Sequence, residues 1–528
     1  MEKQKKGFRK GVAVGLIVIG LLAVIIGAVI LIKGASLDNK ERDYKVDYSG
    51  IATGSINARV AVHDPSIIKA DGKYYIFGSH MVGGVTEDLR TWTRVGNGYN
   101  EKNTVYGNLF ADGLHVFDYA GNKNSVIPTD DGGVHVWAPD PIYNETTGLY
   151  YLYYCTTSTW NASNLCYGVS ESVTGPYEWK GALIYSGFNA KTIEDTNVLD
   201  VVSEDYAFDN YLSGDGYNFR DFPNAIDPSV FYDEDGRMWM VYGSWSGGMF
   251  LLELDPATGE VIHPEADPEN HVDPYYGKWL MGGNHKSIEG PYILYDEVSG
   301  YYYLFVSYGS LTRTGGYQIR VFRSETVNGE YVDMNGAYFE GKGDHSLYGL
   351  KLSGNYMLPS LKRAYMATGH NSAFVDEDGK RYVVYHTRFD DGTENHSPRV
   401  KQFFVNEEGW PCMLPYATGG ETVSETGYSK DEVVGKYYVI NQGTEIDAKK
   451  AEPVMFYLEK NGKVYGDGIQ GTWEMTKDTY YMKITYNEVE YSGVFCAMQD
   501  EAGTDVMVFS AVGNNESVWG VKYPATEE

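Results

Sequence analysis

The sequence has few cysteines for its length. Its 528 residues include four Cys, and none lies in a CxxC or Cys/His spacing typical of zinc sites. Cys155 and Cys166 flank a predicted hairpin, so a cross-strand disulfide is one interpretation. The favoured one is that these two residues, Cys412 and Cys496 are all buried or half-buried thiols.

Basic residues are also scarce. Lys and Arg total 43 against 72 acidic residues, which gives a formal net charge of −29. Nucleic-acid binding requires a cationic surface, so this balance argues against nucleic acid as a partner. The Ala/Leu/Glu/Lys excess of helical proteins is absent as well, whereas aromatic residues make up 15% of the chain and glycines number 62. This composition predicts an all-β protein with many tight turns and aromatic faces suited to sugars.

One long segment without charge lies near the N-terminus. Residues 11–32 are apolar throughout and follow the basic residues 1–10. At a helical rise of about 1.5 Å per residue, this segment is about 33 Å long, enough to cross a bilayer. No A-x-A-like exit follows it, so we predict an uncleaved transmembrane signal anchor that leaves the rest of the chain at the cell surface. A cleaved signal and a secreted protein are the alternative.

Five degenerate repeats follow, about 60 to 90 residues apart. Each consists of a polar head, an apolar strand, a Gly-containing turn and an aromatic strand. The turns are Asp71-Gly72, Thr147-Gly148, Asp235-Gly236, Ser299-Gly300 and Asp378-Gly379. Strand, Gly turn and strand form the signature of a β-hairpin, because Gly supplies the positive φ that tight turns require.

Five such units, each too small to be stable alone, predict a five-bladed β-propeller. A two-sheet sandwich is the alternative, but it would not explain the recurring polar head. The first strand of each blade lies nearest the propeller axis, so the heads should meet at one end of the channel. The head side chains expected to converge there are Asp64, Asp140, Asp227, Glu289 and His370.

The predicted propeller covers residues 55–420 and follows a polar tether at 33–54. Residues 421–432 are polar and read as a linker. Residues 433–528 contain short alternating strands separated by Gly and Asn turns, which predicts a small β-barrel or sandwich domain. This C-terminal part contains no catalytic constellation, so we predict an accessory or packing role for it.

The three carboxylates Asp64, Asp227 and Glu289 indicate catalysis. A single Asp before a strand is usually a turn or capping residue. Three carboxylates at equivalent positions of different blades would lower the stability of the fold, because like charges at one end of the channel repel each other. Hydrolysis of a glycosidic bond needs one protonated and one ionised carboxyl group, and a third carboxylate can raise the pKa of the acid.

The heads "HDPSII", "WAPD", "AIDPSVF", "SIEGPYI" and "GHNS", in this order, resemble glycoside hydrolase family 43, in particular its two-domain endo-1,5-α-L-arabinanases. The resemblance runs from about residue 55 to the C-terminus. It implies an extracellular, inverting enzyme that cleaves internal α-1,5 bonds of arabinan. Asp64 would be the general base, Glu289 the general acid, and Asp227 the residue that tunes the pKa of the acid. Base and acid should lie about 6.5 to 9.5 Å apart, which leaves room for water.

The resemblance also implies a calcium ion on the propeller axis, near His370. A hydrogen-bonded histidine without an ion is the alternative, because calcium prefers oxygen ligands. Asp140 would contact the substrate or serve only as a structural hydrogen-bond partner. Substrate contacts are expected from Trp160, Asn161, Asn224, Ser244, Trp245, Ser246, His285 and Lys286. The two tryptophans among them would equally suit packing within the blades.

Two other functions remain open from the sequence. One is an exo-acting α-L-arabinofuranosidase or β-xylosidase of the same family. The other is a non-catalytic glycan-binding propeller, which predicts that at least one head carboxylate is lost, whereas all three are present. The predicted partner is arabinan, and a monomer is expected.

Overall fold

The computed structural model describes residues 42–99, 102–106, 109 and 115–524. The predicted anchor at 11–32 lies outside them, as do residues 33–41 of the predicted tether. None of the helices in the described ranges is long and apolar enough to cross a membrane.

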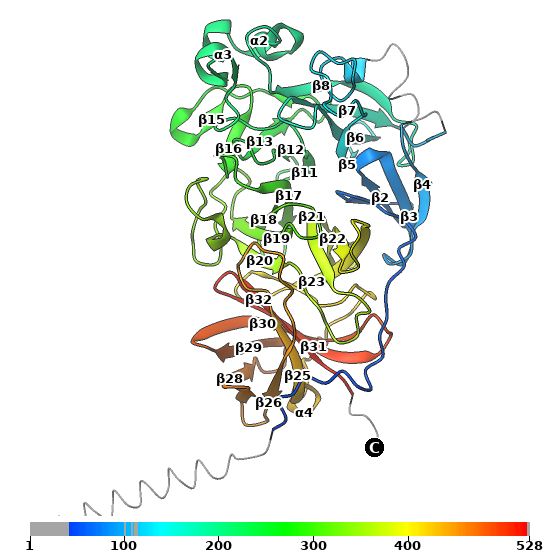
Figure 1. Cartoon of the computed structure of the whole chain (residues 1–528), viewed down its shortest axis with the longest axis vertical. Coiled ribbons are helices and arrows are strands. Elements are labelled where there is room, and N and C mark those ends of the chain that lie inside the picture. The colour runs from blue at the N-terminus through cyan, green and yellow to red at the C-terminus, as the bar shows by residue number, and fades with distance from the viewer. Residues whose placement is uncertain (1–41, 100–101, 107–108, 110–114, 525–528) are drawn as a thin grey trace, which may run out of the picture. The chain divides into compact units, whose positions relative to one another are not determined.

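Five antiparallel sheets form the blades of a propeller (Figure 1). Blade one contains β1 (Ser66–Ala70), β2 (Lys73–Gly78), β3 (Val82–Thr86) and β4 (Thr93–Gly96). Blade two contains β5 (Val136–Asn144), β6 (Leu149–Thr157), β7 (Ser163–Ser170) and β8 (Glu178–Ser186). Blade three contains β11 (Ser229–Tyr232), β12 (Met238–Tyr242), β13 (Met249–Leu254), β14 (Val261–Ile262), β15 (Val272–Asp273) and β16 (Gly277–Met281).

Blade four contains β17 (Ile288–Asp296), β18 (Tyr301–Tyr308), β19 (Gln318–Ser324) and β20 (Leu350–Ser353). Blade five contains β21 (Tyr365–Val375), β22 (Arg381–Phe389), β23 (Ser397–Val405) and β24 (Pro411–Met413). The first strands β1, β5, β11, β17 and β21 contact one another in turn, and β21 contacts β1 again. The ring is therefore closed, which confirms the five-bladed propeller and excludes the sandwich.

The predicted turns connect the first two strands of each blade. In blade one, Ala70 pairs with Lys73 across Asp71-Gly72, and in blade four Asp296 pairs with Tyr301. The five predicted turn glycines have φ between 71° and 79°, a range that a side chain with a Cβ rarely adopts.

The C-terminal domain is a closed barrel of eight antiparallel strands (Figure 1). Its strands are β25 (Gly435–Asn441), β26 (Val454–Leu458), β27 (Lys463–Gly466), β28 (Ile469–Met475), β29 (Tyr481–Tyr486), β30 (Val489–Gln499), β31 (Asp505–Gly513) and β32 (Glu516–Lys522). Aromatic and aliphatic side chains, such as Trp473 and Phe509, fill its interior. Of the two folds predicted for this domain, the structure therefore shows the barrel and not the sandwich.

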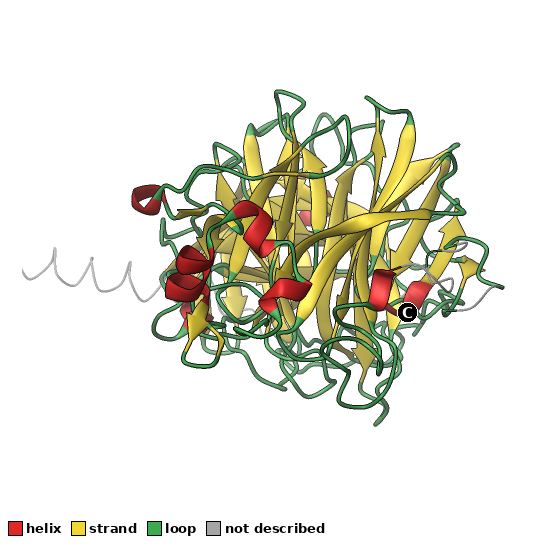
Figure 2. Cartoon of the chain, turned by 90° about the horizontal axis from the view of Figure 1, so that it is seen from above, coloured by secondary structure: helices red, strands yellow, loops and turns green. Residues whose placement is uncertain are grey.

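Helices are short in the described part of the chain (Figure 2). The α-helices are α2 (Val198–Val201), α3 (Glu204–Tyr211) and α4 (Lys430–Val433), and a two-stranded ribbon of β9 (Leu212–Ser213) and β10 (Gly216–Tyr217) follows α3. The 3-10 helices are η1 (Ser79–Met81), η2 (His115–Phe117), η3 (Ile193–Asp195), η4 (Pro268–Asn270) and η5 (His345–Leu347). Ser429 and Glu432 form a capping box on α4, so part of the predicted linker is ordered by its own hydrogen bonds.

The barrel and the propeller share a hydrophobic core. One buried cluster contains Leu352 and Trp410 from the blades together with Val508 and Trp519 from the barrel. The end of the predicted tether is also held in place, because the Gly54 N–H donates to Ser360 O at 2.8 Å. The barrel is therefore packed onto the propeller rather than suspended from a linker.

All four cysteines are buried free thiols, as the favoured interpretation predicted. Cys155 lies on β6 and Cys166 on β7, where Cys166 pairs with Tyr154 rather than with Cys155. The two thiols belong to different hydrophobic clusters. A disulfide between them is therefore excluded by the register of the hairpin.

Candidate active site

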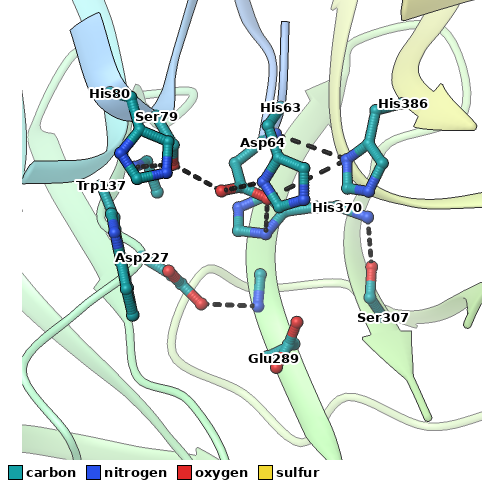
Figure 3. Close-up of polar contacts among 12 residues, drawn as sticks. His63, Asp64, Ser79, His80, Trp137, Asp227, Glu289, Ser307, His370 and His386 are labelled. Atoms are coloured by element: carbon teal, nitrogen blue, oxygen red, sulfur yellow. Dashed lines mark hydrogen bonds and ion pairs between the residues drawn. The ribbon is translucent and has the colours of Figure 1, made fainter. Parts of the chain in front are cut away.

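The five strand heads converge on the propeller axis, as predicted. A cavity of about 20 Å³ there is lined by residues from every blade, among them Asp64, Asp140, Asp227, Pro291 and His370. This volume accommodates roughly one water molecule. Figure 3 shows Asp64, Asp227, Glu289 and His370 grouped around this point, although they come from different blades.

The heads share a backbone conformation that the sequence pattern did not indicate. One residue in each head is left-handed, with φ between 42° and 58°: Asp64, Ala138, Asp227, Gly290 and His370. In four heads this residue precedes Pro, where an extended conformation is normally preferred. Strain of this kind, about 1 to 3 kcal/mol per residue, persists where the surroundings enforce it, and it is concentrated at functional sites.

The expectation that the three carboxylates occupy equivalent positions is wrong for Glu289. The left-handed residue equivalent to Asp64 and Asp227 is Gly290, and Glu289 precedes it by one position. Glu289 pairs with Ser307 just before a register shift in the β17–β18 ladder. It therefore approaches the axis from another direction. A Cβ added to Gly290 would lie 3.1 Å from the His370 ring, so a larger residue here would press against that ring.

Asp64 is buried and surrounded by donors. Its Oδ2 accepts hydrogen bonds from the Ser79 hydroxyl and from His63 Nδ1, the latter at 2.7 Å, and its Oδ1 lies 3.1 Å from His370 Nδ1 (Figure 3). Burial opposes ionisation, but the charges of His63 and His370 outweigh it and hold the pKa of Asp64 well below its usual range. This carboxyl group is therefore ionised at neutral pH.

Glu289 has a different environment. Trp245 Nε1 donates to its Oε2 and the Tyr317 hydroxyl donates to its Oε1, both at 2.7 Å. Desolvation by the surrounding protein raises the pKa of Glu289, and the negative charge of Asp227 raises it further. Glu289 can therefore remain protonated at a pH at which Asp64 is ionised.

Asp227 is buried and interacts electrostatically with both of the others. Its Oδ2 accepts the Gly290 N–H at 3.2 Å, and the Ser244 hydroxyl also bonds to it. Burial and then the charge of Asp64 raise the pKa of Asp227. Asp140 serves the fold instead, because its carboxylate accepts from Ser66 of blade one and from the Val230 N–H of blade three, at 2.6 Å. It ties three blades together.

The other predicted substrate residues divide into two groups. Trp160 is 52% exposed, and its ring contacts His285 at 5.2 Å, which in turn contacts Trp245 at 5.2 Å. These three side chains form an aromatic surface beside Glu289. The others make contacts within the protein: Asn224 donates to Trp160 O, Asn161 O accepts from Ser186, Ser246 O accepts the His285 N–H, Ser244 bonds to Asp227, and Lys286 donates to Gly343 O.

A groove that no sequence motif indicates lies beside Asp64. It has a volume of about 490 Å³, and Asp64 lies in its wall. The other groove residues include His80, Trp137, Leu311, Arg388, Glu394 and His396. Trp137 is part of the second head, so the repeat pattern could have identified it as a residue of the site. The others lie on loops or late in their strands, where no repeat marks them.

A cation site was predicted at His370. The His370 backbone N–H donates to Ser307 Oγ at 2.6 Å, and Nδ1 of the His370 ring faces Asp64. These contacts also fit the alternative prediction, a hydrogen-bonded histidine without an ion. Among the described residues, the ligand atoms of His63, Asp64 and His386 lie within 4.8 Å of one another, and the buried Nε2 of His386 has no protein partner. Burial lowers the pKa of His386 strongly, so its imidazole is neutral and able to ligate a metal. The residues present therefore fit a cation completed by water.

A site that combines one ionised carboxyl group with a second one that retains its proton is suited to acid–base cleavage of a glycosidic bond. The fold and the site together define a glycoside hydrolase. Residues 217–411 match the sequence profile described as glycosyl hydrolases family 43, and residues 415–520 match one described as a C-terminal lipocalin-like domain.

The chain belongs to glycoside hydrolase family 43. An extracellular endo-α-(1→5)-L-arabinanase of Thermotoga petrophila is 38% identical to it over 87% of this chain and 93% of that protein. The extracellular endo-α-(1→5)-L-arabinanase 2 of Bacillus subtilis is 36% identical, over 88% of this chain and 93% of that protein. The crystal structure of an endo-1,5-α-L-arabinanase from Thermotoga petrophila superimposes with a TM-score of 0.75 at 37% identity, covering 90% of this chain and 100% of that one.

Proposed function

We propose that this protein is an extracellular endo-acting hydrolase of α-1,5-linked arabinan that inverts the anomeric configuration. The observation that carries the proposal is the contrast between Asp64 and Glu289, whose pKa values are shifted in opposite directions at one site. Its relatives that act as endo-arabinanases match almost the whole chain and supply the substrate class.

In this mechanism Asp64 accepts a proton from a water molecule, which attacks the anomeric carbon. Glu289 donates its proton to the glycosidic oxygen of the leaving chain. Ser79 and His63 fix the orientation of the base, whereas Tyr317 and Trp245 fix that of the acid. The ionised form of Asp227 favours the protonated form of Glu289, so the two buried carboxyl groups titrate as a pair.

Incubation with debranched arabinan tests the proposal. An endo enzyme produces a ladder of oligosaccharides that shortens with time, and proton NMR of early products should show the β-anomer first. Release of arabinose alone would indicate an exo enzyme instead. No hydrolysis of arabinan would overturn the proposed substrate.

The raised pKa of Glu289 predicts an alkaline limit to activity. The protonated form is the active one, so kcat/KM should be full below the raised pKa and fall as the pH rises through it. Replacing Asp227 with Asn removes the charge that raises this pKa. The alkaline limb of the pH profile should therefore move to lower pH in Asp227→Asn, and an unmoved limb would contradict the assigned role.

Trp160 is expected to bind substrate rather than to support the fold, because half of its surface is exposed. An aromatic pair contributes about 0.5 to 1.5 kcal/mol, and with the same value for stacking on a sugar face Trp160→Ala should raise KM about 2- to 12-fold with little change in kcat. Tyr143→Ala is the matched control, since Tyr143 is also exposed but lies at the hairpin end of β5. A Trp160→Ala variant with unchanged KM would place the substrate elsewhere.

A calcium ion near the axis is part of the proposal, with His386 or the predicted His370 as its protein ligand. A bound cation there would polarise nearby water. Chelator treatment followed by calcium add-back, with metal content measured by mass spectrometry, tests it. The ligand is the histidine whose replacement by Ala abolishes metal retention, and an unchanged metal content in both variants would reject both.

We also propose that residues 11–32 anchor the enzyme in the membrane, with the propeller outside the cell. Cell fractionation decides between this and the secreted alternative. An anchored enzyme stays with the membrane fraction until detergent is added, whereas a secreted one appears in the medium with its N-terminus shortened.

A further inference from the structure

Residues 442–451 form most of the loop between β25 and β26 of the barrel and lie against blade four, beside the segment that supplies Tyr317. Ile446 of this loop packs against the hydrophobic cluster that blades three and four share. The approach is close: a Cβ added to Gly316 would lie 2.8 Å from Asp447 N. Tyr317 follows Gly316 directly, and its hydroxyl donates to Glu289.

Buried polar side chains of blade four bind the backbone of this loop. Gln318 Nε2 donates to Glu445 O at 2.9 Å and to Gly316 O at 3.0 Å. Lys351 Nζ also donates to Glu445 O, at 2.9 Å, and Arg320 Nη2 donates to Thr444 O. The barrel therefore supplies carbonyl acceptors to three buried side chains of blade four.

These contacts couple the two domains energetically. Gln318, Arg320 and Lys351 are at most 6% exposed. A buried donor that loses its acceptor costs about 1 to 3 kcal/mol, and more when it is charged. Blade four and the loop consequently take up their positions together. Gln318 is the link, because it bonds both to the loop and to Gly316, the residue just before Tyr317.

We propose that the 442–451 loop is a positioning element of the active site, which fixes Tyr317 through Gln318 and thereby orients the carboxyl group of Glu289. The inference rests on the proposed hydrolysis. It gives the C-terminal barrel a role in the chemistry, although the barrel contributes no residue to the groove lining. Gln318 and Tyr317 are positioning residues, since they act through Glu289.

The geometry at Glu289 explains why small shifts matter. One donor holds each oxygen, Tyr317 on Oε1 and Trp245 on Oε2, so the plane of the carboxyl group is set from both sides. Tyr317 is itself confined, since a Cβ added to Gly369 would lie 2.3 Å from its ring. Misplacement of a catalytic group by about 1 Å can cost about 100-fold in rate.

The test compares Gln318→Leu, Gln318→Glu and Tyr317→Phe in the full chain. Gln318→Glu keeps the acceptor that Arg320 uses but loses the donor to Glu445 O, so it examines the loop contact if the Leu variant fails to fold. The control is Ser510→Ala, which removes a buried barrel-to-propeller bond to Met413 O that does not lead to Glu289. Each variant is assayed on debranched arabinan and on a nitrophenyl arabino-oligosaccharide, whose leaving group needs no proton.

The positioning role predicts a loss in kcat of about 10-fold or more on arabinan, with KM within twofold and a much smaller loss on the nitrophenyl substrate. In Tyr317→Phe the alkaline limb should move to higher pH, opposite to Asp227→Asn, because the hydroxyl stabilises the ionised form. Ser510→Ala should lower the Tm alone.

Equal losses on both substrates, or folded Gln318 variants with unchanged kinetics, would overturn the inference. A wild-type chain inactive on arabinan contradicts the proposed function, and the comparison of leaving groups then proceeds on any aryl glycoside it cleaves.

Discussion

Replacement of Glu289 by Gln should lower kcat on debranched arabinan by about 10²- to 10⁴-fold, the range that general acid catalysis contributes. The amide has nearly the same shape as the carboxyl group but no proton to deliver. It also leaves one donor unmatched, because its single oxygen cannot accept from both Trp245 and Tyr317. A modest drop in Tm should therefore accompany the loss of activity.

Leaving-group dependence identifies this loss as general acid catalysis. A nitrophenyl arabino-oligosaccharide departs without protonation, so Glu289→Gln should hydrolyse it far better, relative to wild type, than it hydrolyses arabinan. Glu377→Gln serves as the control, because Glu377 is an exposed residue that pairs with Lys69 beside the hairpin turn of blade five. Near-normal cleavage of arabinan by Glu289→Gln would refute the assignment of the acid.

Replacement of Asp64 by Asn should be as damaging, about 10²- to 10⁴-fold in kcat, because the attacking water then lacks its base. Azide needs no deprotonation and should restore part of the activity on the nitrophenyl substrate. In an inverting enzyme the product is the glycosyl azide of opposite anomeric configuration, which NMR identifies. Azide should not restore the activity of Glu289→Gln. If it did, Glu289 would be the base and Asp64 the acid.

The sequence predicted the hairpins because the information is local. Each turn glycine, such as Gly72 or Gly300, occupies a left-handed position within a few residues of the strands it joins. The repetition of this unit then indicated a ring of blades, and the ring brought the heads together. The same reasoning correctly placed Asp64, Asp227 and Glu289 near the axis.

Features that depend on contacts between distant residues escaped prediction. The offset of Glu289 arises from a register shift in β17, which no local pattern marks. Tyr317 lies 28 positions after Glu289, just before the third strand of its blade, and His386 lies on a second strand. Neither position is marked by the repeated heads. Lys351 and Gln318 looked like ordinary polar residues, since their contacts with the barrel loop join positions about 90 to 130 residues apart in sequence.

Each blade is built from one continuous stretch of chain, and its innermost and outermost strands are not exchanged with another blade. The sheet contacts are therefore local in sequence, which favours rapid formation. We expect the blades to fold one after another during synthesis, each soon after it emerges. Pulsed hydrogen exchange on nascent chains halted after blade three should find blades one and two already protected, and unprotected blades would contradict this order. Ring closure and the docking of the barrel are the steps that must await the finished chain, so the acid acquires its final orientation last.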